Sequence, residues 1–249
     1  KLLQFCDMEL SPTSRAHTSF NIVGTTYGRW SSSENIVMKY GTGNLQQIPK
    51  RGVGLLIRGM YTVTDPDKYI VEADFSQAEA VIVAYLIGDE ILIEAFSKRL
   101  DIHKLTASRM FGIIIDNVTP EQREIGKTIR HATNYSLGAG GLADQLKCST
   151  AEAKRHLDAF HCMCPQLRRW HTKIQEELIR SRSLTTPLGR THRFLGRVGD
   201  AQTCAETYRS AYSFLPQSTI GELLNMSLVL FYHRYGYEYD LLLQLHDAI

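Results

Sequence analysis

Two aspartates in this sequence each follow a short apolar segment that is typical of a buried strand. Asp74 follows residues 69–73, and Asp247 lies just beyond residues 239–245. If the two strands are neighbours, both carboxylates face one site, where Mg²⁺ is a natural counter-charge because it takes oxygen ligands and binds substrate phosphates. Two such ions would support in-line phosphoryl transfer. A capping or turn role for each aspartate is the alternative.

A second set of candidate residues recurs every four positions. Residues 119–121, Thr-Pro-Glu, are a strong helix start signal and predict a helix over 120–137. Each step of four advances about 40° around a helix, so one stripe spanning about 120° contains Arg123, Lys127, His131 and Tyr135. The guanidinium and ammonium suit a triphosphate, and the two rings could stack on a sugar or base. A solvated helix face is the alternative.

The elements that must position these residues follow from periodicity and capping signals. Ser76 is the expected N-cap of a helix with Glu79 three residues on, and Asp101 is the expected cap of the next helix. Glycines at 138, 140 and 141 are expected to end the helix of the stripe. We also expect brief strands over 11–54, helices over 102–111, 150–161 and 166–181, a turn at Gly189, and a long helix over 201–235 kinked at Pro216.

Composition limits the class of protein. The chain has 249 residues, 43% hydrophobic and 22% charged, which is ordinary for a globular protein. Its formal net charge of +2 does not by itself indicate a nucleic-acid binder, and no apolar run approaches the ~20 residues of a membrane span, so no membrane partner is expected. The five cysteines are an odd number without framework spacing, which favours free thiols in a reducing intracellular compartment.

Charge is unevenly distributed along the chain. Seven acids and one base lie between Asp65 and Glu90, whereas eight bases and two acids lie between Arg168 and Arg197. This arrangement would suit a protein that holds cations at one surface and phosphates at another. Two solvated faces are the alternative.

The motifs, taken together, resemble family A DNA polymerases, the DNA polymerase I type. Residues 74–79, Asp-Phe-Ser-Gln-Ala-Glu, are similar to motif A, usually DYSQxE. Arg123-x3-Lys127-x7-Tyr135 resembles motif B, and His246-Asp247 resembles motif C. Further similarities, in the family's order, are residues 27–32 (TGRLSS), 44–49 (NLQxIP), 101–103 (DIH), and Arg209 with Pro216-Gln217.

The resemblance implies template-directed addition of deoxynucleotides to a primer 3′ end, with release of pyrophosphate, in DNA replication or repair. The catalytic residues would be Asp74, Asp247 and Lys127. Two Mg²⁺ ions would be held by Asp74, Asp247 and the backbone carbonyl of Phe75. The implied nucleotide-binding residues are Arg123, Lys127, His131, Tyr135, Gln77, Glu79 and His103, with Glu79 as a steric gate. The implied DNA-binding residues are Arg29, Arg209, Gln217 and His246.

The fold implied by the resemblance is α+β: a right-hand polymerase palm with a small antiparallel sheet and inserted helical fingers. Residues 1–75 would be the N-terminal part of the palm, 76–182 mainly fingers, and 183–249 the C-terminal part of the palm. The family's thumb and exonuclease domains would precede Lys1, and closing palm strands would follow Ile249. Primer-template DNA and deoxynucleoside triphosphates are the implied partners, with replication accessory proteins as further candidates.

Several positions depart from the family pattern. His131 stands where the family has Phe or Tyr, Ala248 where motif C has Glu, Val81 where an Arg often ends motif A, and Ser136 where a Gly follows motif B. These departures suggest a divergent, viral branch, and hence a bacterial or phage-infected host cytoplasm.

Two alternatives remain open. One is a single-subunit RNA polymerase, which has a related palm and fingers. The presence of Glu79 within residues 74–79 of this chain argues against it. A non-catalytic nucleic-acid-binding module is permitted by Ala248 and His131, whereas the retained aspartates, Arg123 and Lys127 oppose it.

Overall fold

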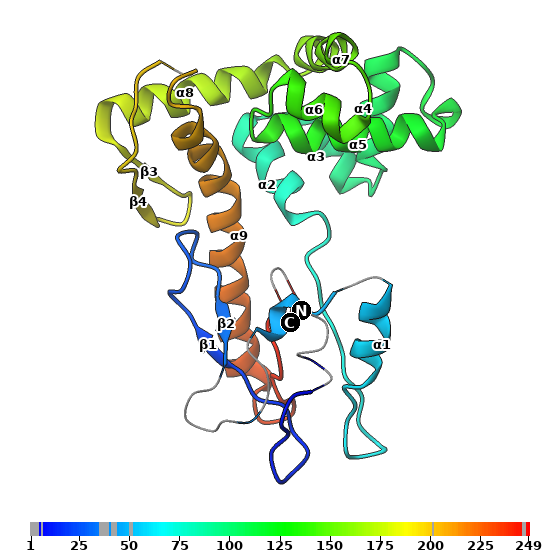
Figure 1. The fold of residues 1–249 in the computed structure, drawn as a ribbon, viewed down its shortest axis with the longest axis vertical. Helices are drawn as coiled ribbons and strands as arrows, with labels where there is room; N and C mark the ends of the chain where they lie inside the picture. The colour runs from blue at the N-terminus through cyan, green and yellow to red at the C-terminus, as the bar shows by residue number, and fades with distance from the viewer. Residues whose placement is uncertain are drawn as a thin grey trace. The chain divides into compact units, whose positions relative to one another are not determined.

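The computed structural model describes residues 5, 7–34, 40, 44–49, 52–200, 202–245 and 248–249 (Figure 1). His246 and Asp247, both candidate site residues, lie outside the described residues. The chain divides into two compact units. Unit 1 is Lys1–Ser76 with Ile220–Ile249, and unit 2 is Gln77–Thr219. Residues 183–219, which we expected with the palm, therefore cluster with the helical unit.

Unit 1 contains the brief strands expected in its first part. Strands β1 (Ser19–Asn21) and β2 (Ser31–Ser33) pair antiparallel, with Phe20 opposite Ser32. They are followed by a 3₁₀ turn, η2 (Leu45–Gln47), and by helix α1 (Val53–Gly59). A small core forms where side chains from these segments meet: Phe5, Leu45, Ile48 and Ile57. Burial of these few apolar groups holds together a region that has little regular secondary structure.

The two strands expected before the aspartates were a wrong prediction. Residues 69–73 and 239–244 form no strand, and Tyr69 and Val71 are exposed. What forms is one short antiparallel contact: Ala73 and Ile249 exchange both backbone hydrogen bonds, at 2.8 and 3.0 Å. An apolar segment forms a strand only where another backbone lies alongside it and pairs with it. Among the described residues, the partner of this segment is limited to 248–249.

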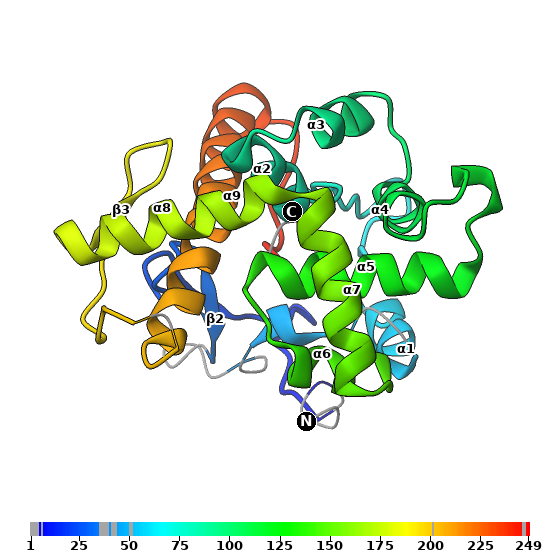
Figure 2. The ribbon, with the colours of Figure 1, turned by 90° about the horizontal axis from the view of Figure 1, so that it is seen from above.

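Unit 2 is a cluster of helices ending in a hairpin (Figures 1 and 2). Its helices are α2 (Ala78–Ile87), α3 (Glu90–Ser97), α4 (Ile102–Phe111), η3 (Ile115–Asn117), α5 (Pro120–Asn134), α6 (Ala139–Leu146), α7 (Thr150–Met163) and α8 (Pro165–Ser181). Strands β3 (Ser183–Thr185) and β4 (Thr191–Arg193) pair antiparallel around Gly189, whose φ is 98°. The long helix α9 (Ala205–Tyr235) continues through Pro216 and begins in this unit. The expected helices and the turn are confirmed, and the kink at Pro216 stays a prediction.

Two local boundaries differ from prediction. Ser76 is not the N-cap of α2, because Gln77 takes that position in a left-handed conformation (φ 54°) without a side-chain cap bond. The glycines do not end α5 either. Tyr135 already closes that helix, Ser136 adopts a left-handed φ of 54°, and Gly140 and Gly141 lie inside α6. A non-glycine residue in this conformation needs support from its surroundings, which sequence signals do not reveal.

The apolar side of α5 lies in the core of unit 2. Ile129 and Ala132 are buried, whereas Ser136 beyond the helix is exposed. Fully buried side chains on the other helices of unit 2 include Leu92, Ile102, Leu142, Phe160 and Leu167. The described cysteines at 148, 162, 164 and 204 are all free thiols. No helix within the described ranges is long and apolar enough to span a membrane.

His171 on α8 joins three helices of unit 2. Its ring is buried and stacks on Tyr212 of α9, with centroids 4.0 Å apart. Its Nε2 lies 3.1 Å from the carbonyl oxygen of Asn134, at the end of α5. Burial lowers the pKa of His171 to about 4, even though the bond to Asn134 favours the charged form. The neutral ring therefore donates its Nε2–H to the carbonyl at physiological pH.

We expect His171 to make unit 2 less stable as the pH falls. Because its folded pKa of about 4 is below the unfolded value of 6.5, the unfolded chain binds more protons between these values. Its contribution is complete above pH ~6.5, and about 3 kcal/mol is lost by pH ~4. Urea unfolding in a Trp30→Phe background, followed by Trp170 fluorescence, measures this dependence.

In His171→Phe, which keeps a ring against Tyr212 but cannot titrate, the free energy of unfolding should fall less steeply with decreasing pH. The exposed His233 provides a matched control as His233→Gln, which should keep the parent slope. An unchanged slope in His171→Phe would contradict the assignment.

Candidate functional site

The helix of the cationic stripe, α5, begins with a complete capping box. The Thr119 hydroxyl accepts a bond from the backbone N–H of Gln122 at 3.3 Å, and the Gln122 side chain accepts one from the Thr119 N–H at 3.0 Å. Pro120 occupies the first helical position, where no backbone donor is needed. The predicted start is confirmed, and it sets the positions of the stripe residues along the helix.

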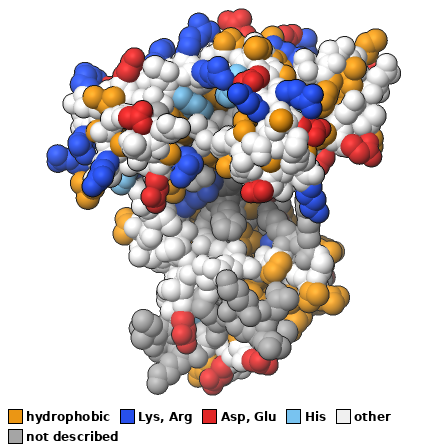
Figure 3. All heavy atoms as spheres, turned by 45° about the horizontal axis from the view of Figure 1, so that its top comes forward, with side chains coloured by type: hydrophobic (Ala, Val, Ile, Leu, Met, Phe, Trp, Pro, Cys, Tyr) orange, Lys and Arg blue, Asp and Glu red, His pale blue; other side chains and the backbone are white. Residues whose placement is uncertain are grey.

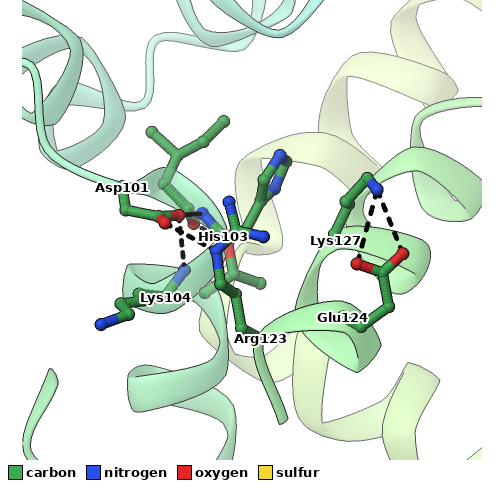
Figure 4. A network of polar contacts seen from close by, with 8 residues as sticks. Asp101, His103, Lys104, Arg123, Glu124 and Lys127 are labelled. Atoms are coloured by element: carbon green, nitrogen blue, oxygen red, sulfur yellow. Dashed lines mark hydrogen bonds and ion pairs between the residues drawn. The ribbon is translucent and has the colours of Figure 1, made fainter. Parts of the chain in front are cut away.

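Arg123 is held by a carboxylate from the neighbouring helix. Its Nε donates to Oδ2 of Asp101 at 2.6 Å, while Oδ1 of Asp101 accepts from the backbone N–H groups of His103 and Lys104, each at 3.0 Å (Figure 4). Burial raises the pKa of the Asp101 carboxyl, but these donors outweigh it and the pKa lies below its usual range. One aspartate thus caps α4 and orients the guanidinium of Arg123.

Lys127, one turn further along α5, pairs within its own helix. Its Nζ lies 3.1 Å from Oε1 of Glu124, and the pair points away from Asp101 (Figure 4). Side-chain exposure is 45% for Lys127 and 61% for Glu124. An ion pair as exposed as this is worth at most about 1 kcal/mol, so a polyanionic ligand can compete for the ammonium.

His103 lies beside these cations on α4. Burial, together with the positive charges of Arg123, Arg130 and Lys127, lowers the pKa of His103, against a raising effect of Asp101. Its Nδ1 is buried and makes no hydrogen bond with the described residues. The ring is therefore neutral near pH 7 and could offer a hydrogen bond rather than a charge.

A close approach of the α4 and α5 backbones brings these residues together. A Cβ at Gly126 would lie 2.8 Å from the carbonyl oxygen of His103 and 3.0 Å from the backbone nitrogen of Ala107. Only a residue without a Cβ allows the two helices this separation. Gly126 thus determines the distance between α4, which Asp101 caps, and α5, which bears Arg123.

The two rings of the stripe interact at the end of α5. His131 and Tyr135 pack edge to face, with centroids 5.7 Å apart. His131 is exposed, whereas the hydroxyl of Tyr135 is buried and makes no hydrogen bond with the described residues. The structure therefore presents one exposed and one partly buried ring for a planar group.

Two further candidates of unit 2 are brought together from distant segments. Nε2 of Gln217 on α9 lies 3.4 Å from Oε1 of Glu79 on α2, a long hydrogen bond that orients the Glu79 carboxylate. Gln77 is exposed at the N-cap of α2, and Arg209 is exposed on α9. Neither Gln77 nor Arg209 is brought against the stripe by any contact described here.

In unit 1, motif A lies beside the end of motif C. Asp74 forms an antiparallel bridge with Ala248, the residue that follows Asp247 in the sequence. Asp74 and Phe75 are exposed, whereas Ala248 is fully buried. The expected proximity of the two motifs is present in the backbone, although the expected strands are not.

Arg29 lies just before β2 in unit 1. The Thr25 hydroxyl donates to its carbonyl oxygen at 2.7 Å, and the preceding Gly28 adopts a φ of 73°. The Gly28 backbone lies close to Gly221 of α9, where an added Cβ would be 3.4 Å away. The residue before Arg29 therefore packs against α9 at Gly221, four residues after Gln217.

Sequence reasoning missed Arg130 as a structural partner of the stripe. Seven residues after Arg123, it lies on the same side of α5 but is buried, and its Nε donates to Oγ1 of Thr106 at 2.8 Å. The seven-residue spacing from Arg123 to Arg130 was visible in the sequence. An arginine on a highly charged helix is nevertheless expected to be exposed, so its burial was not predicted.

Comparisons with known proteins cover the whole chain. Residues 1–249 match the family model described as DNA polymerase family A. DNA polymerase I of Mycobacterium tuberculosis is 35% identical over 218 residues, covering 86% of this chain and 23% of that protein. The thermostable DNA polymerase I of Thermus aquaticus is 34% identical over 243 residues, covering 95% and 28%. The chain thus spans about a quarter of the length of these relatives.

A solved structure is also similar. The polymerase domain of Pol1 from M. smegmatis, in complex with DNA primer-template and dNTP, has a TM-score of 0.87 and 30% sequence identity. The match covers 99% of this chain and 43% of that chain. It confirms the predicted fold class, the α+β polymerase fold with a palm and helical fingers. The viral branch stays a prediction, since the relatives compared here are bacterial.

The two roles of Asp101 can be separated by substitution. Asp101→Asn keeps a good N-cap and loses the charge, so we expect a cost below about 1 kcal/mol for this partly exposed pair. Asp101→Ala loses the cap as well and should cost about 1 kcal/mol more. Urea unfolding followed by Trp170 fluorescence provides the comparison, with the exposed Asp116 as control in Asp116→Asn. Equal destabilisation by the Asn and Ala variants would show that the cap contributes nothing.

Proposed function

The chain belongs to DNA polymerase family A, and on that premise we propose that it contains the nucleotidyl-transfer region of a DNA-directed DNA polymerase. The reaction is addition of a deoxynucleoside triphosphate to a primer 3′ end opposite a template, in replication or repair. Because the chain is about a quarter of its relatives' length, the activity is proposed for the protein of which this region is a part.

The observation that supports this proposal most directly is the pairing of motif A with the end of motif C. The bridge between Asp74 and Ala248 joins two segments that are far apart in sequence, each with an aspartate at or next to the contact. If both carboxylates face one site, their repulsion is costly unless a cation balances it. A packing role would not require acidic residues at both positions.

The donor chemistry at these positions fits a divalent cation. Asp74, Asp247 and the carbonyl of Phe75 are hard oxygen donors, the kind that Mg²⁺ prefers. Among the described residues no group of three or more His, Cys, Asp or Glu could hold a metal, but Asp247 is not one of those residues. We propose two Mg²⁺ ions, which when bound would supply the charge that activates the primer hydroxyl and stabilises the leaving pyrophosphate.

The residues of unit 2 would bind and orient the triphosphate. Arg123, held by Asp101, offers a fixed guanidinium to the phosphates, and Lys127 offers a mobile ammonium. Neutral His103 would add a hydrogen bond. His131 and Tyr135 would contact the sugar and the templating pair. Gln77, in motif A, is a further proposed nucleotide-binding residue. Glu79, oriented by Gln217, would exclude a 2′-hydroxyl.

DNA contacts are proposed for Arg29, Arg209, Gln217 and His246. Exposed bases on α8, Arg168, Arg169 and Lys173, add positive charge to unit 2, and Figure 3 shows Lys and Arg side chains across the face of this unit turned to the viewer. The similar polymerase domain was solved with primer-template and dNTP, which supports both as partners. Replication accessory proteins remain candidate partners, and the free thiols support a reducing compartment.

Replacing a motif aspartate tests the metal assignment. We expect Asp247→Asn and Asp74→Asn each to abolish primer extension while primer-template affinity stays near that of the parent, because each removes a metal ligand and no phosphate contact. Extension of a labelled primer-template with Mg²⁺ is the measurement, using the full-length protein. Asp240→Asn, at an exposed acid of the same segment, is the matched control.

Extension by the aspartate variants at the parent's rate would refute the metal site. Binding of primer-template without extension by the parent itself would favour the non-catalytic module. Ribonucleotide incorporation at rates near those for deoxynucleotides would favour the RNA polymerase alternative.

Lys127→Ala tests the triphosphate assignment. The lost ammonium stabilises charge that grows in the transition state, so the single-turnover rate should fall by about 10²-fold or more, and triphosphate affinity should weaken. Rapid-quench extension over a range of dNTP concentrations separates the two effects. Lys154→Ala removes an exposed lysine of α7 and should retain the parent's rate. An unaltered single-turnover rate in Lys127→Ala would exclude this role.

A further inference from the structure

Arg130 is a buried cation on the same helix as the proposed triphosphate-binding residues. It is 6% exposed, and its Nε donates to Oγ1 of Thr106 on α4 at 2.8 Å. The guanidinium carbon lies 5.4 Å from the centroid of the Phe160 ring on α7. The Thr106 hydroxyl donates a hydrogen bond to the Ile102 carbonyl at 2.6 Å, and its oxygen accepts the one from Arg130. One side chain of α5 therefore contacts both α4 and α7.

A buried carboxylate counters this cation. Asp89, 3% exposed, caps α3 by accepting the backbone N–H of Leu92 at 3.1 Å. Its other oxygen accepts the thiol of Cys164, at the junction of α7 and α8, at 3.6 Å. Burial lowers the pKa of Arg130 to about 10, while Cys164 and Asp89 oppose that change and Arg109 adds to it. The guanidinium therefore remains charged at neutral pH.

The contacts of Arg130 belong to a series along the α4–α5 interface. Asp101 forms an ion pair with Arg123, and the backbone of His103 lies close to Gly126. Thr106 accepts a hydrogen bond from Arg130. The partners advance together along both helices, so the contact at Arg130 sets the register of α5 two turns beyond Arg123. A shift of the helix along α4 would break this buried contact.

We propose that Arg130 is a positioning residue for nucleotide binding: through Thr106 and Phe160 it holds α5 in the register that presents Arg123 and Lys127 to the triphosphate. This inference rests on the proposed function for its catalytic consequence. Its structural part, an anchor made by Arg130, does not depend on that function.

Buried opposite charges can often be replaced by apolar groups without loss of stability, and their retention then reflects a need for one defined geometry. Arg130→Met keeps an unbranched, flexible side chain and removes the charge. Arg130→Met combined with Asp89→Asn also removes the counter-charge while keeping an N-cap on α3. In this double variant no buried charge is left unpaired, so stability and register can be measured separately.

The functional test is single-turnover primer extension by the full-length protein over a range of dNTP concentrations. We expect the double variant to bind dNTP at least about fivefold more weakly, a typical coupling between distant groups, with primer-template affinity unchanged. Arg130→Lys, which keeps the charge, should recover part of the loss. Arg155→Met, the same change at an exposed arginine of α7, should bind dNTP like the parent.

A double variant that folds and binds dNTP as tightly as Arg155→Met would overturn the proposal. So would a uniform loss of rate, dNTP affinity and primer-template affinity, since that pattern indicates general destabilisation rather than a change of register.

The structural test uses two buried thiols and needs no activity. Cys164 is 1% exposed beside Asp89, whereas Cys204 is 7% exposed and precedes α9. Iodoacetamide labelling measured by peptide mass spectrometry should be faster at Cys164 in Arg130→Met than in the parent, with Cys204 unchanged. Equal labelling of Cys164 in both proteins would overturn the anchor. If the parent does not extend primers but Cys164 labelling increases selectively, the anchor is supported and the polymerase activity is refuted.

Discussion

The close approach of α4 and α5 at Gly126 is the constraint on which the helical unit depends. Because no Cβ separates the two backbones there, short side chains such as Asp101 and Thr106 reach across to the arginines of α5. A wider separation would leave Arg130 buried without a partner, which is among the most costly defects in a folded protein. The geometry of the nucleotide-binding helix thus follows from backbone contact as much as from its charged residues.

The cations of α5 differ in how firmly they are held, and the difference fits their proposed roles. Arg130 is buried and fixed, Arg123 is partly exposed and paired with an aspartate of another helix, and Lys127 is paired only within α5. Restraint decreases along this order while access to solvent increases. A rigid anchor therefore supports groups that remain able to bind an incoming anion.

Unit 1 has a different physical basis. Its described residues form a small apolar core, two short strands and a backbone contact of 73–74 with 248–249. Many of its large apolar side chains are exposed, including Tyr69, Val71, Tyr237 and Leu242. A metal site formed by Asp74 and Asp247 would depend on one short backbone contact rather than on a full sheet.

The sequence by itself determined the family, the helices of unit 2, the caps at Asp101 and Thr119, and the stripe on α5. These depend on local signals, namely periodicity, capping side chains and motif order, which act within a few residues. Only the tertiary structure decided that Arg130 is buried, that Gln217 meets Glu79, that Gln77 rather than Ser76 precedes α2, and that residues 69–73 form no strand. Each of these depends on which distant backbone or side chain lies opposite, and local periodicity contains no information about that partner.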